Sequence, residues 1–277
     1  MDLTDQKKCT EQGKDPPRYH DWTGPLRLYD IRRMAPPATL RDALATPDAK
    51  RAYVRRLFTT IADRYDLITV LLSYGQDQRW KRRIIDLSEL TSGTRVLDVA
   101  CGTGDLAFAA ARRGAIVTGL DVTRRMVQLA RARSTRSKTE VQFLVGDMSA
   151  LPFRDDGFDV VTTGYGIRNV PEIVPAIREM RRVLKPGGLL LSLDFNRPQH
   201  PLVRAVYLSY LTVVGAALGF ALHRDPDTYR YIPESIRRYP GAEAVRAIIE
   251  ANGFGTSRYV PVLGGLMAIH MAVKQAD

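Results

Sequence analysis

Short apolar runs alternate with amphipathic stretches along most of the chain, beginning at residue 94. The runs RVLDVA, AIVTGLD, VQFLVGD, FDVVTTGY and GLLLSLDF are typical of buried strands, and DLAFAAARR, TRRMVQLARARS and PEIVPAIREMRRVL have helical periodicity. A further helix, AEAVRAIIEANGF, precedes two last strands, TSRYVPVL and LMAIHMAVK. The KPGG sequence at 185–188 indicates a sharp stop and turn before the fifth strand. The alternation predicts an α/β fold: a mostly parallel seven-stranded sheet with helices on both faces.

The N-terminal part of the chain lacks this alternation. Residues 1–46 combine several prolines with many charges and little periodicity, so we expect a poorly ordered extension. A single domain is predicted over 47–277, and it begins with helices over 47–90.

One segment, 205–222, carries no charged side chain over eighteen residues, which is the lower edge of the length for a membrane span. A span here would leave the last helix and strands on the wrong side of a bilayer. A buried or membrane-resting helix that covers an apolar pocket is the favoured interpretation. We therefore interpret 197–240 as a helical insertion that forms a lid over the substrate.

Charge and cysteine content bear on the partners and the setting of the protein and not on its fold. A net charge of +11 and a pI near 9.8 favour binding to nucleic acid, anionic lipid or acidic partners. The alternative is that the charge serves only solubility. No RNA-binding motif accompanies the basic clusters, so nucleic acid is not expected. Two cysteines, Cys9 and Cys101, form no framework or metal cluster, and no metal site is predicted. A cytoplasmic setting is expected, because the first thirty residues are polar and charged, unlike a signal peptide.

The candidate chemistry begins in VLDVACGTGDLA, where Gly102, Gly104 and Ala107 fit the dinucleotide pattern GxGxxG/A after a strand. Two carboxylates argue against a pyrophosphate. Asp98 ends the strand and Asp105 opens the helix, where a dinucleotide needs positive potential. A ligand with an amino group and a sulfonium suits these charges, which favours S-adenosylmethionine (SAM).

Two further acidic residues follow later strands. Asp121 ends the second strand, where a carboxylate accepts from ribose hydroxyls, and Asp147 ends the third, where it can meet the adenine amino group. Ligands of open α/β sheets bind at the carboxyl ends of the strands, where these residues are predicted to lie. Each aspartate alone also suits a helix cap or turn, but four such positions together favour a nucleoside site.

These segments resemble the class I SAM-dependent methyltransferases, and within them the ubiquinone/menaquinone biosynthesis C-methyltransferase family. The motifs are RYDLITVLLSYGQDQRWKR (64–82), RVLDVACGTGD, GYGIRNV (164–170), DFNRP (194–198), YRYIPESIRRYP (229–240) and GGLMAIH (264–270), which span about 50–275. The resemblance implies a Rossmann-like fold and SAM-dependent methylation of a ring carbon on a polyprenylated benzoquinol or naphthoquinol. The cofactor-binding residues are then expected to be Asp98, Gly102, Thr103, Gly104, Asp121, Val122, Asp147, Met148 and Gly164. The chain departs from the family at Asp77, often histidine, and at Gly164, often serine.

A ring carbon is a poor nucleophile unless a neighbouring hydroxyl is ionised. Arg168 in GIRNV is the leading candidate to stabilise that phenolate or hold a relaying water, since guanidinium cannot itself be a base. Asn169 is expected to orient the ring oxygen, or to be a turn residue. His270 has the right pKa for a base but also suits a satisfied core position. Tyr65 and Tyr165 are candidates for the substrate pocket.

Three other functions stay open on the sequence: a methyltransferase of a soluble phenolic metabolite, a non-catalytic SAM-fold scaffold, and, on charge alone, an RNA methyltransferase. The intact cofactor loop disfavours the second, and the apolar 205–222 segment disfavours the third. A prenylated quinol is the expected substrate, with an anionic membrane surface at the inner face as a further partner. The choice between benzoquinol and naphthoquinol and the oligomeric state, a homo-oligomer included, are left open.

Overall fold

The computed structural model describes residues 40–73 and 75–276. Most of the extension predicted for 1–46 lies outside these residues. Its last part is folded, because helix α1 (Leu40–Ala43) begins at residue 40, and Leu44 packs with Val54 and Tyr231 in a small buried cluster. The folded residues thus begin before residue 47, where the sequence places the start of the domain.

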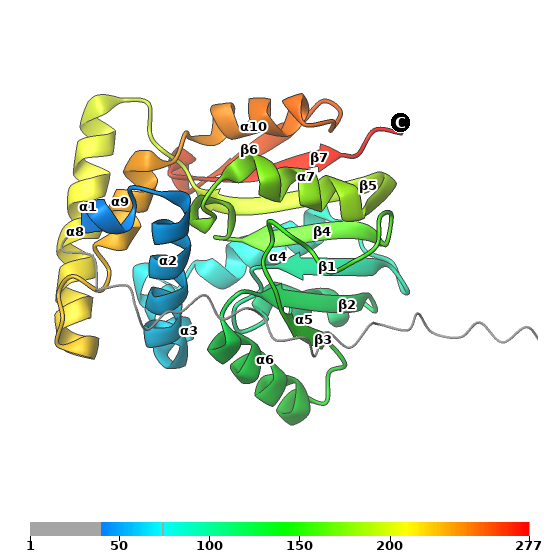
Figure 1. Cartoon of the computed structure of the whole chain (residues 1–277), viewed down its shortest axis with the longest axis horizontal. Coiled ribbons are helices and arrows are strands. Elements are labelled where there is room, and N and C mark those ends of the chain that lie inside the picture. The colour runs from blue at the N-terminus through cyan, green and yellow to red at the C-terminus, as the bar shows by residue number, and fades with distance from the viewer. Residues whose placement is uncertain (1–39, 74, 277) are drawn as a thin grey trace, which may run out of the picture. The chain divides into compact units, whose positions relative to one another are not determined.

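Seven strands form one sheet in the order β3-β2-β1-β4-β5-β7-β6 (Figure 1). The strands are β1 (Arg95–Val99), β2 (Ile116–Asp121), β3 (Gln142–Val145), β4 (Phe158–Gly164), β5 (Leu184–Phe195), β6 (Arg258–Val262) and β7 (Met267–Val273). The first five strands pair in parallel with one another, and β7 runs antiparallel to both β5 and β6. The predicted mostly parallel, seven-stranded sheet is confirmed.

The sheet has a separate apolar core on each face. One core joins α4 (Asp77–Leu87), α5 (Asp105–Ala111) and α6 (Arg124–Ser137) to strand residues such as Val96. The other joins α7 (Ile173–Val183) and α10 (Ala242–Ala251) to the opposite face, through neighbours such as Leu97. Successive residues of a strand point to opposite faces, so a strand covered by helices on both sides is apolar throughout.

The KPGG sequence does not precede the fifth strand, as predicted, but lies inside it. β5 already begins at Leu184, which pairs with Phe158, and the register then shifts so that Val160 pairs with Leu189. The irregularity is a bulge-like break in the ladder, and Gly187 adopts a φ of +76° there. The turn signal was real, but it bends a strand rather than separating two elements.

Helices beyond the carboxyl ends of the parallel strands build the rest of the domain (Figure 1). They are α2 (Pro47–Ile61), the 3-10 turn η1 (Ala62–Arg64), α3 (Tyr65–Leu72), α8 (Pro201–His223) and α9 (Tyr231–Arg238). The 197–240 segment predicted as an insertion thus consists mainly of α8 and α9. Helix α8 is long and apolar enough to cross a membrane by length and composition, and 28% of its most apolar window is buried within the fold.

Candidate active site

The glycine-rich loop connects β1 to α5 at the carboxyl edge of the sheet. Gly102 and Gly104 have φ angles of +54° and +91°, which glycine adopts without strain. A Cβ at Gly104 would come within 2.8 Å of Cζ of Phe143, so a side chain there would collide with the core. Because β2 and β4 flank β1 on opposite sides, the loop lies where the strand order reverses, the usual ligand crevice of such sheets.

Two buried aspartates fix this loop. Asp98 accepts hydrogen bonds from the Ala107 amide at 3.1 Å and from Thr162 Oγ1 at 2.9 Å, so each carboxylate oxygen already has a partner. Burial raises the pKa of Asp98 to about 7. Asp98 thus connects the end of β1 to α5 and β4 and holds the loop in place, and its predicted contact with the ligand stays a prediction.

Asp121 accepts from the Gly102 amide at 2.9 Å and from the Thr123 amide at 2.7 Å, one bond to each oxygen. A carboxylate oxygen has two lone pairs, so acceptor capacity remains for ribose hydroxyls. Burial raises the pKa of Asp121, and the two amides oppose that shift by stabilising the charged form. The geometry is compatible with the predicted ribose contact.

Asp105 does not have the role that the sequence suggested. Its carboxylate pairs with Lys81 at 2.8 Å and with Arg133 at 2.5 Å, and it accepts from Gln78 Nε2 at 2.8 Å. Burial favours the neutral acid, but the two cations outweigh it and hold the pKa of Asp105 well below its ordinary value. A charge already neutralised by two cations contributes little to binding a sulfonium, so this part of the electrostatic argument was wrong.

The remaining predicted cofactor residues follow β1, β2, β3 and β4. Asp147 accepts from the Ser149 amide at 2.8 Å, and its other oxygen lies 3.4 Å from Arg51 Nε on α2. Thr103 Oγ1 donates to Asp66 on α3 at 2.6 Å. Val122, Met148 and Gly164 lie in the same set of loops, directly after or at the ends of these strands. The predicted residues are therefore brought to one edge of the sheet.

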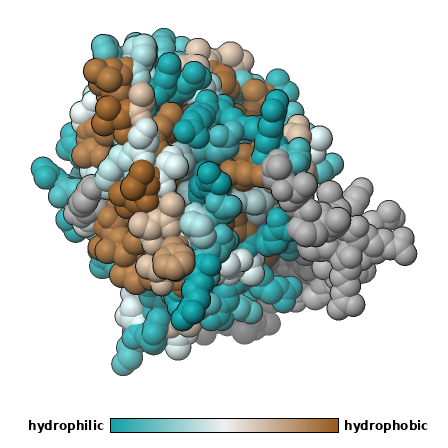
Figure 2. All heavy atoms as spheres, turned by 90° about the vertical axis from the view of Figure 1, so that its left-hand side faces the viewer, coloured by the Kyte–Doolittle hydropathy of each residue, from teal (hydrophilic) through white to brown (hydrophobic). Residues whose placement is uncertain are grey.

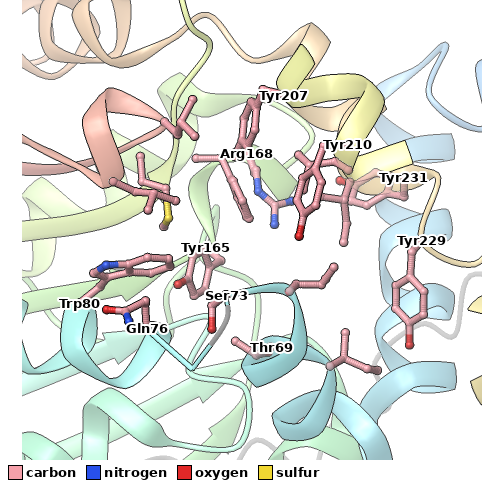
Figure 3. A pocket seen from close by; sticks show the side chains of 18 of the residues that line it. Thr69, Ser73, Gln76, Trp80, Tyr165, Arg168, Tyr207, Tyr210, Tyr229 and Tyr231 are labelled. Atoms are coloured by element: carbon pink, nitrogen blue, oxygen red, sulfur yellow. The ribbon is translucent and has the colours of Figure 1, made fainter. Parts of the chain in front are cut away.

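A cavity of about 730 Å³ lies beyond this edge (Figure 3). Apolar side chains of α2, α3 and α8 form most of its wall. Its polar groups include Ser73, Gln76, Tyr165 and Arg168, and Trp80 lies beside Gln76 and Tyr165 (Figure 3). The cavity is thus an apolar chamber with a few polar groups, the composition expected of a site for a largely hydrophobic small molecule.

Arg168 projects into this cavity from the 3-10 turn η2 (Ile167–Asn169), as Figure 3 shows. Its Nε lies 3.0 Å from Oδ1 of Asp194, a carboxylate that is 1% exposed. Its Nη1 donates to Asn169 Oδ1 at 2.9 Å and to Ser235 Oγ at 3.2 Å. The guanidinium is therefore buried, charged and held in one orientation.

Comparison with known proteins assigns this arrangement to a family. Residues 46–274 match the model of the ubiE/COQ5 methyltransferase family. The chain belongs to this family. It is a SAM-dependent methyltransferase, and SAM is its cofactor.

Two curated relatives of this chain are matched over nearly their whole length. The demethylmenaquinone methyltransferase of Staphylococcus aureus strain JH9 is 33% identical over 237 residues, which are 84% of this chain and 98% of the relative, and that of strain Newman gives the same values.

Solved structures are more distant and show the fold alone. A SAM-dependent methyltransferase of Thermotoga maritima, described as a possible histamine N-methyltransferase, superposes with a TM-score of 0.58 at 18% identity, over 80% of this chain and 100% of that one. The YcgJ protein of Bacillus subtilis gives 0.54 at 22% identity, over 71% and 98%.

The residues of this methyltransferase fit SAM. The loop glycines leave backbone open to a close ligand, and Asp121 retains acceptor capacity at the end of β2. Gly164 has no side chain toward the loop, and a Cβ there would lie 3.2 Å from Cδ1 of Leu106. The family's serine is thus replaced by a residue that leaves space rather than a hydroxyl. Among residues 40–73 and 75–276 no cluster of three potential metal ligands occurs.

The two predicted tyrosines both line the cavity. Tyr65 is half-buried, its desolvated hydroxyl has a pKa raised to about 12, and a Cβ at Gly102 would lie 3.7 Å from its ring. Tyr165 has a φ of +61°, uncommon for a side chain of this size, and its hydroxyl donates to Asp77 Oδ1 at 2.7 Å. The backbone strain at Tyr165 turns its ring toward Trp80 and Gln76.

Asn169 is not among the residues that line the cavity, so the structure favours a structural role over the predicted contact with the ring oxygen. Its Oδ1 accepts from Arg168 and from the Tyr231 hydroxyl, each at 2.9 Å, and its Nδ2 donates to the Tyr165 carbonyl at 2.7 Å. The amide therefore holds other residues of the site in place.

His270 lies on the face of β7 that packs on α10, away from the cavity. Its Nε2 lies 2.9 Å from the Ala242 carbonyl oxygen, and its ring packs on Tyr259 with centroids 5.6 Å apart. Burial lowers its pKa. The ring is buried in the core and does not line the cavity, and its Nδ1 has no hydrogen-bond partner among the described residues, so the position favours a core residue over the predicted catalytic base.

Several residues of the site were missed. The sequence did not single out Trp80, Tyr207, Tyr210 or Tyr231, although all four line the cavity. Tyrosines in an otherwise apolar segment were the available signal, since a buried hydroxyl needs a partner or a ligand.

Proposed function

We propose that this family member methylates a ring carbon of a polyprenylated quinol, demethylmenaquinol or a ubiquinol precursor. The observation that carries the proposal is the cavity itself: an apolar chamber with Arg168 and Tyr165 in its wall, next to the cofactor loop through Tyr65. The relatives named demethylmenaquinone methyltransferases support a naphthoquinol ring over a benzoquinol ring.

The walls suit a prenyl tail. Side chains such as Ile68, Leu72 and Leu211 surround the chamber, and Leu202 and Val203 belong to the first turn of α8. A cavity of about 730 Å³ is in the range that holds a drug-sized molecule, so it accommodates the ring and the beginning of a tail. The rest of the tail would continue past the exposed side chains of α8.

The reaction requires negative charge on a ring oxygen, because the ionised hydroxyl makes the neighbouring ring carbon nucleophilic. SAM, when bound, supplies a methyl group on a positively charged sulfur. The ring carbon gains the methyl carbon, the electron pair of the broken carbon–sulfur bond stays on sulfur as a neutral thioether, and the one proton that the quinol loses overall passes to water. A guanidinium does not act as a base, so Arg168 would stabilise the phenolate without taking that proton. The apolar wall excludes water and strengthens that interaction.

A second part of the proposal places the protein on the inner face of the membrane, where its substrate resides. Leu202, Val206, Val213 and Phe220 of α8 are each at least 63% exposed. Apolar side chains gather on the face of the molecule that carries α8 (Figure 2). Together with the net charge of +11 this suits an anionic lipid surface. Val213→Asp should lower co-sedimentation with anionic liposomes at low salt, whereas the control Ile116→Asp, on β2, should not.

The decisive experiment compares substrates directly. The purified protein with SAM is assayed on demethylmenaquinol and, side by side, on a soluble phenol. Methylation of the quinol at a ring carbon, identified by mass spectrometry, is expected. Methylation of the phenol alone would contradict the proposal. In a strain that lacks the protein, the quinone pool should accumulate a demethylated quinone whose mass identifies the ring.

A further inference from the structure

The hydroxyl of Tyr165 lies in the cavity wall, and its hydrogen is already used in a hydrogen bond. It donates to Asp77 Oδ1 at 2.7 Å, and Asp77 is only 1% exposed. The other carboxylate oxygen of Asp77 lies 2.6 Å from Lys81 Nζ. Burial raises the pKa of Tyr165, so the phenol keeps its proton. Because a hydroxyl has one hydrogen and two lone pairs, Tyr165 offers the cavity an acceptor only.

We propose that Asp77 and Tyr165 select the reduced form of the ring, through a hydrogen bond that Tyr165 accepts from a ring hydroxyl. A quinol carries O–H donors, whereas the carbonyl oxygens of a quinone can only accept. If a quinone occupied this place, its carbonyl oxygen and the Tyr165 oxygen would both be acceptors and could not form a hydrogen bond. A buried polar group left without a partner raises the free energy of the complex. This inference rests on the proposed function, since it assumes a ring that exists in both forms.

Neighbouring polar groups do not cancel this preference. Ser73 Oγ donates to the Val70 carbonyl at 3.2 Å, so its hydrogen is engaged too. Gln76 carries both a donor and an acceptor and serves either form of the ring. Arg168 and Tyr165 both contact Phe195, the guanidinium carbon at 4.8 Å from the ring centroid and the tyrosine ring at 5.6 Å. One ring oxygen near Arg168 and a hydroxyl near Tyr165 are thus compatible in one bound molecule.

Asp77→Asn provides the sharpest perturbation, because Lys81 fixes the orientation of the new amide. Lys81 can only donate, so the amide oxygen faces Lys81 and the amide nitrogen faces Tyr165. The nitrogen then donates to the Tyr165 oxygen, and the tyrosine hydrogen is released toward the cavity. The variant turns an acceptor into a donor without changing the shape of the wall.

The test measures binding rather than turnover. The dissociation constants of 1,4-naphthoquinone and of 1,4-naphthalenediol, the latter kept reduced without oxygen, are determined by quenching of tryptophan fluorescence, which Trp80 in the cavity wall makes possible. Asp77→Asn should shift the preference from diol toward quinone by about thirtyfold, since a net hydrogen bond of about 1 kcal/mol is lost for one form and another is gained for the other form. Tyr165→Phe, which has no hydroxyl, should give an intermediate preference.

Asp86→Asn is the matched control. Asp86 is on the same helix α4, its carboxylate is half exposed, and it pairs with Arg113 on the surface, so this change should leave the preference unaltered. If wild type binds both forms and neither Asp77→Asn nor Tyr165→Phe alters their ratio, the selection by Asp77 and Tyr165 is refuted while the proposed function stands. If wild type binds neither form, the proposed function fails and the selection fails with it.

Discussion

Replacing Arg168 tests the proposed chemistry most directly, provided that stability and turnover are separated. In Arg168→Ala the carboxylate of Asp194, 1% exposed, loses its cation. Removing one partner of a buried ion pair lowers the free energy of unfolding by about 3–5 kcal/mol. Removing a group that stabilises developing negative charge lowers kcat by a factor of about 10²–10³. SAM affinity should stay nearly intact, because Arg168 lies in the cavity wall and not in the glycine loop.

A double variant, Arg168→Met with Asp194→Asn, separates the two effects. It removes both buried charges, and neutral replacements of a buried pair are often tolerated. Asp194 also accepts from the backbone amides of Arg168 at 3.0 Å and Phe195 at 2.8 Å, and asparagine retains only one such oxygen, so recovery of stability should be partial. Turnover should not recover.

Three measurements decide the outcome: urea denaturation for stability, calorimetry for SAM, and kcat with saturating quinol. A double variant that regains wild-type kcat would refute the role of Arg168 in stabilising the phenolate. Loss of SAM binding in either variant would show instead that η2 supports the cofactor loop.

Further predictions concern Asp121, His270 and Asp98. Asp121→Ala should weaken SAM binding in calorimetry, and unchanged affinity would show the ribose assignment to be wrong. His270→Asn should keep near-normal kcat, because the ring lies outside the cavity, and a large loss of kcat would reinstate it as a base. Burial raises the pKa of Asp98 to about 7, so between about pH 4 and that value the folded state holds a proton that the unfolded state has released, and the free energy of unfolding falls as pH rises. Asp98→Asn should remove this fall, up to about 4 kcal/mol, and equal slopes in urea denaturation of wild type and variant would contradict it.

The fold was predictable because it depends on local patterns. Each apolar run of strand length became a strand, since burial on both faces of a sheet leaves little choice of residue. The Gly102–Gly104 loop was equally readable, because positive φ and close packing leave glycine as the residue that fits.

The side-chain partners were less predictable, because they join positions far apart in the chain. Asp105 was assigned to a ligand cation, but Lys81 and Arg133, 24 and 28 positions away, neutralise it. His270 was assigned to catalysis, but β7 is buried on both faces, so its sequence carries no alternation to show which face the ring takes. Asn169 follows Arg168 directly and yet turns to Tyr165 and Tyr231 instead of the cavity.

The helices α2 and α3 connect the two halves of the site. Asp66 accepts from Thr103 in the glycine loop, and Arg51 lies 3.4 Å from Asp147. The same segment contributes Ile61 and Tyr65 to the cavity wall. A Cβ at Gly102 would lie 3.7 Å from the Tyr65 ring, so this side chain adjoins both the glycine loop, where we expect SAM, and the cavity, where we propose the acceptor. Methyl transfer requires the two reacting atoms in van der Waals contact and in line. Under the proposed function, α3 is therefore the element that aligns the two ligands.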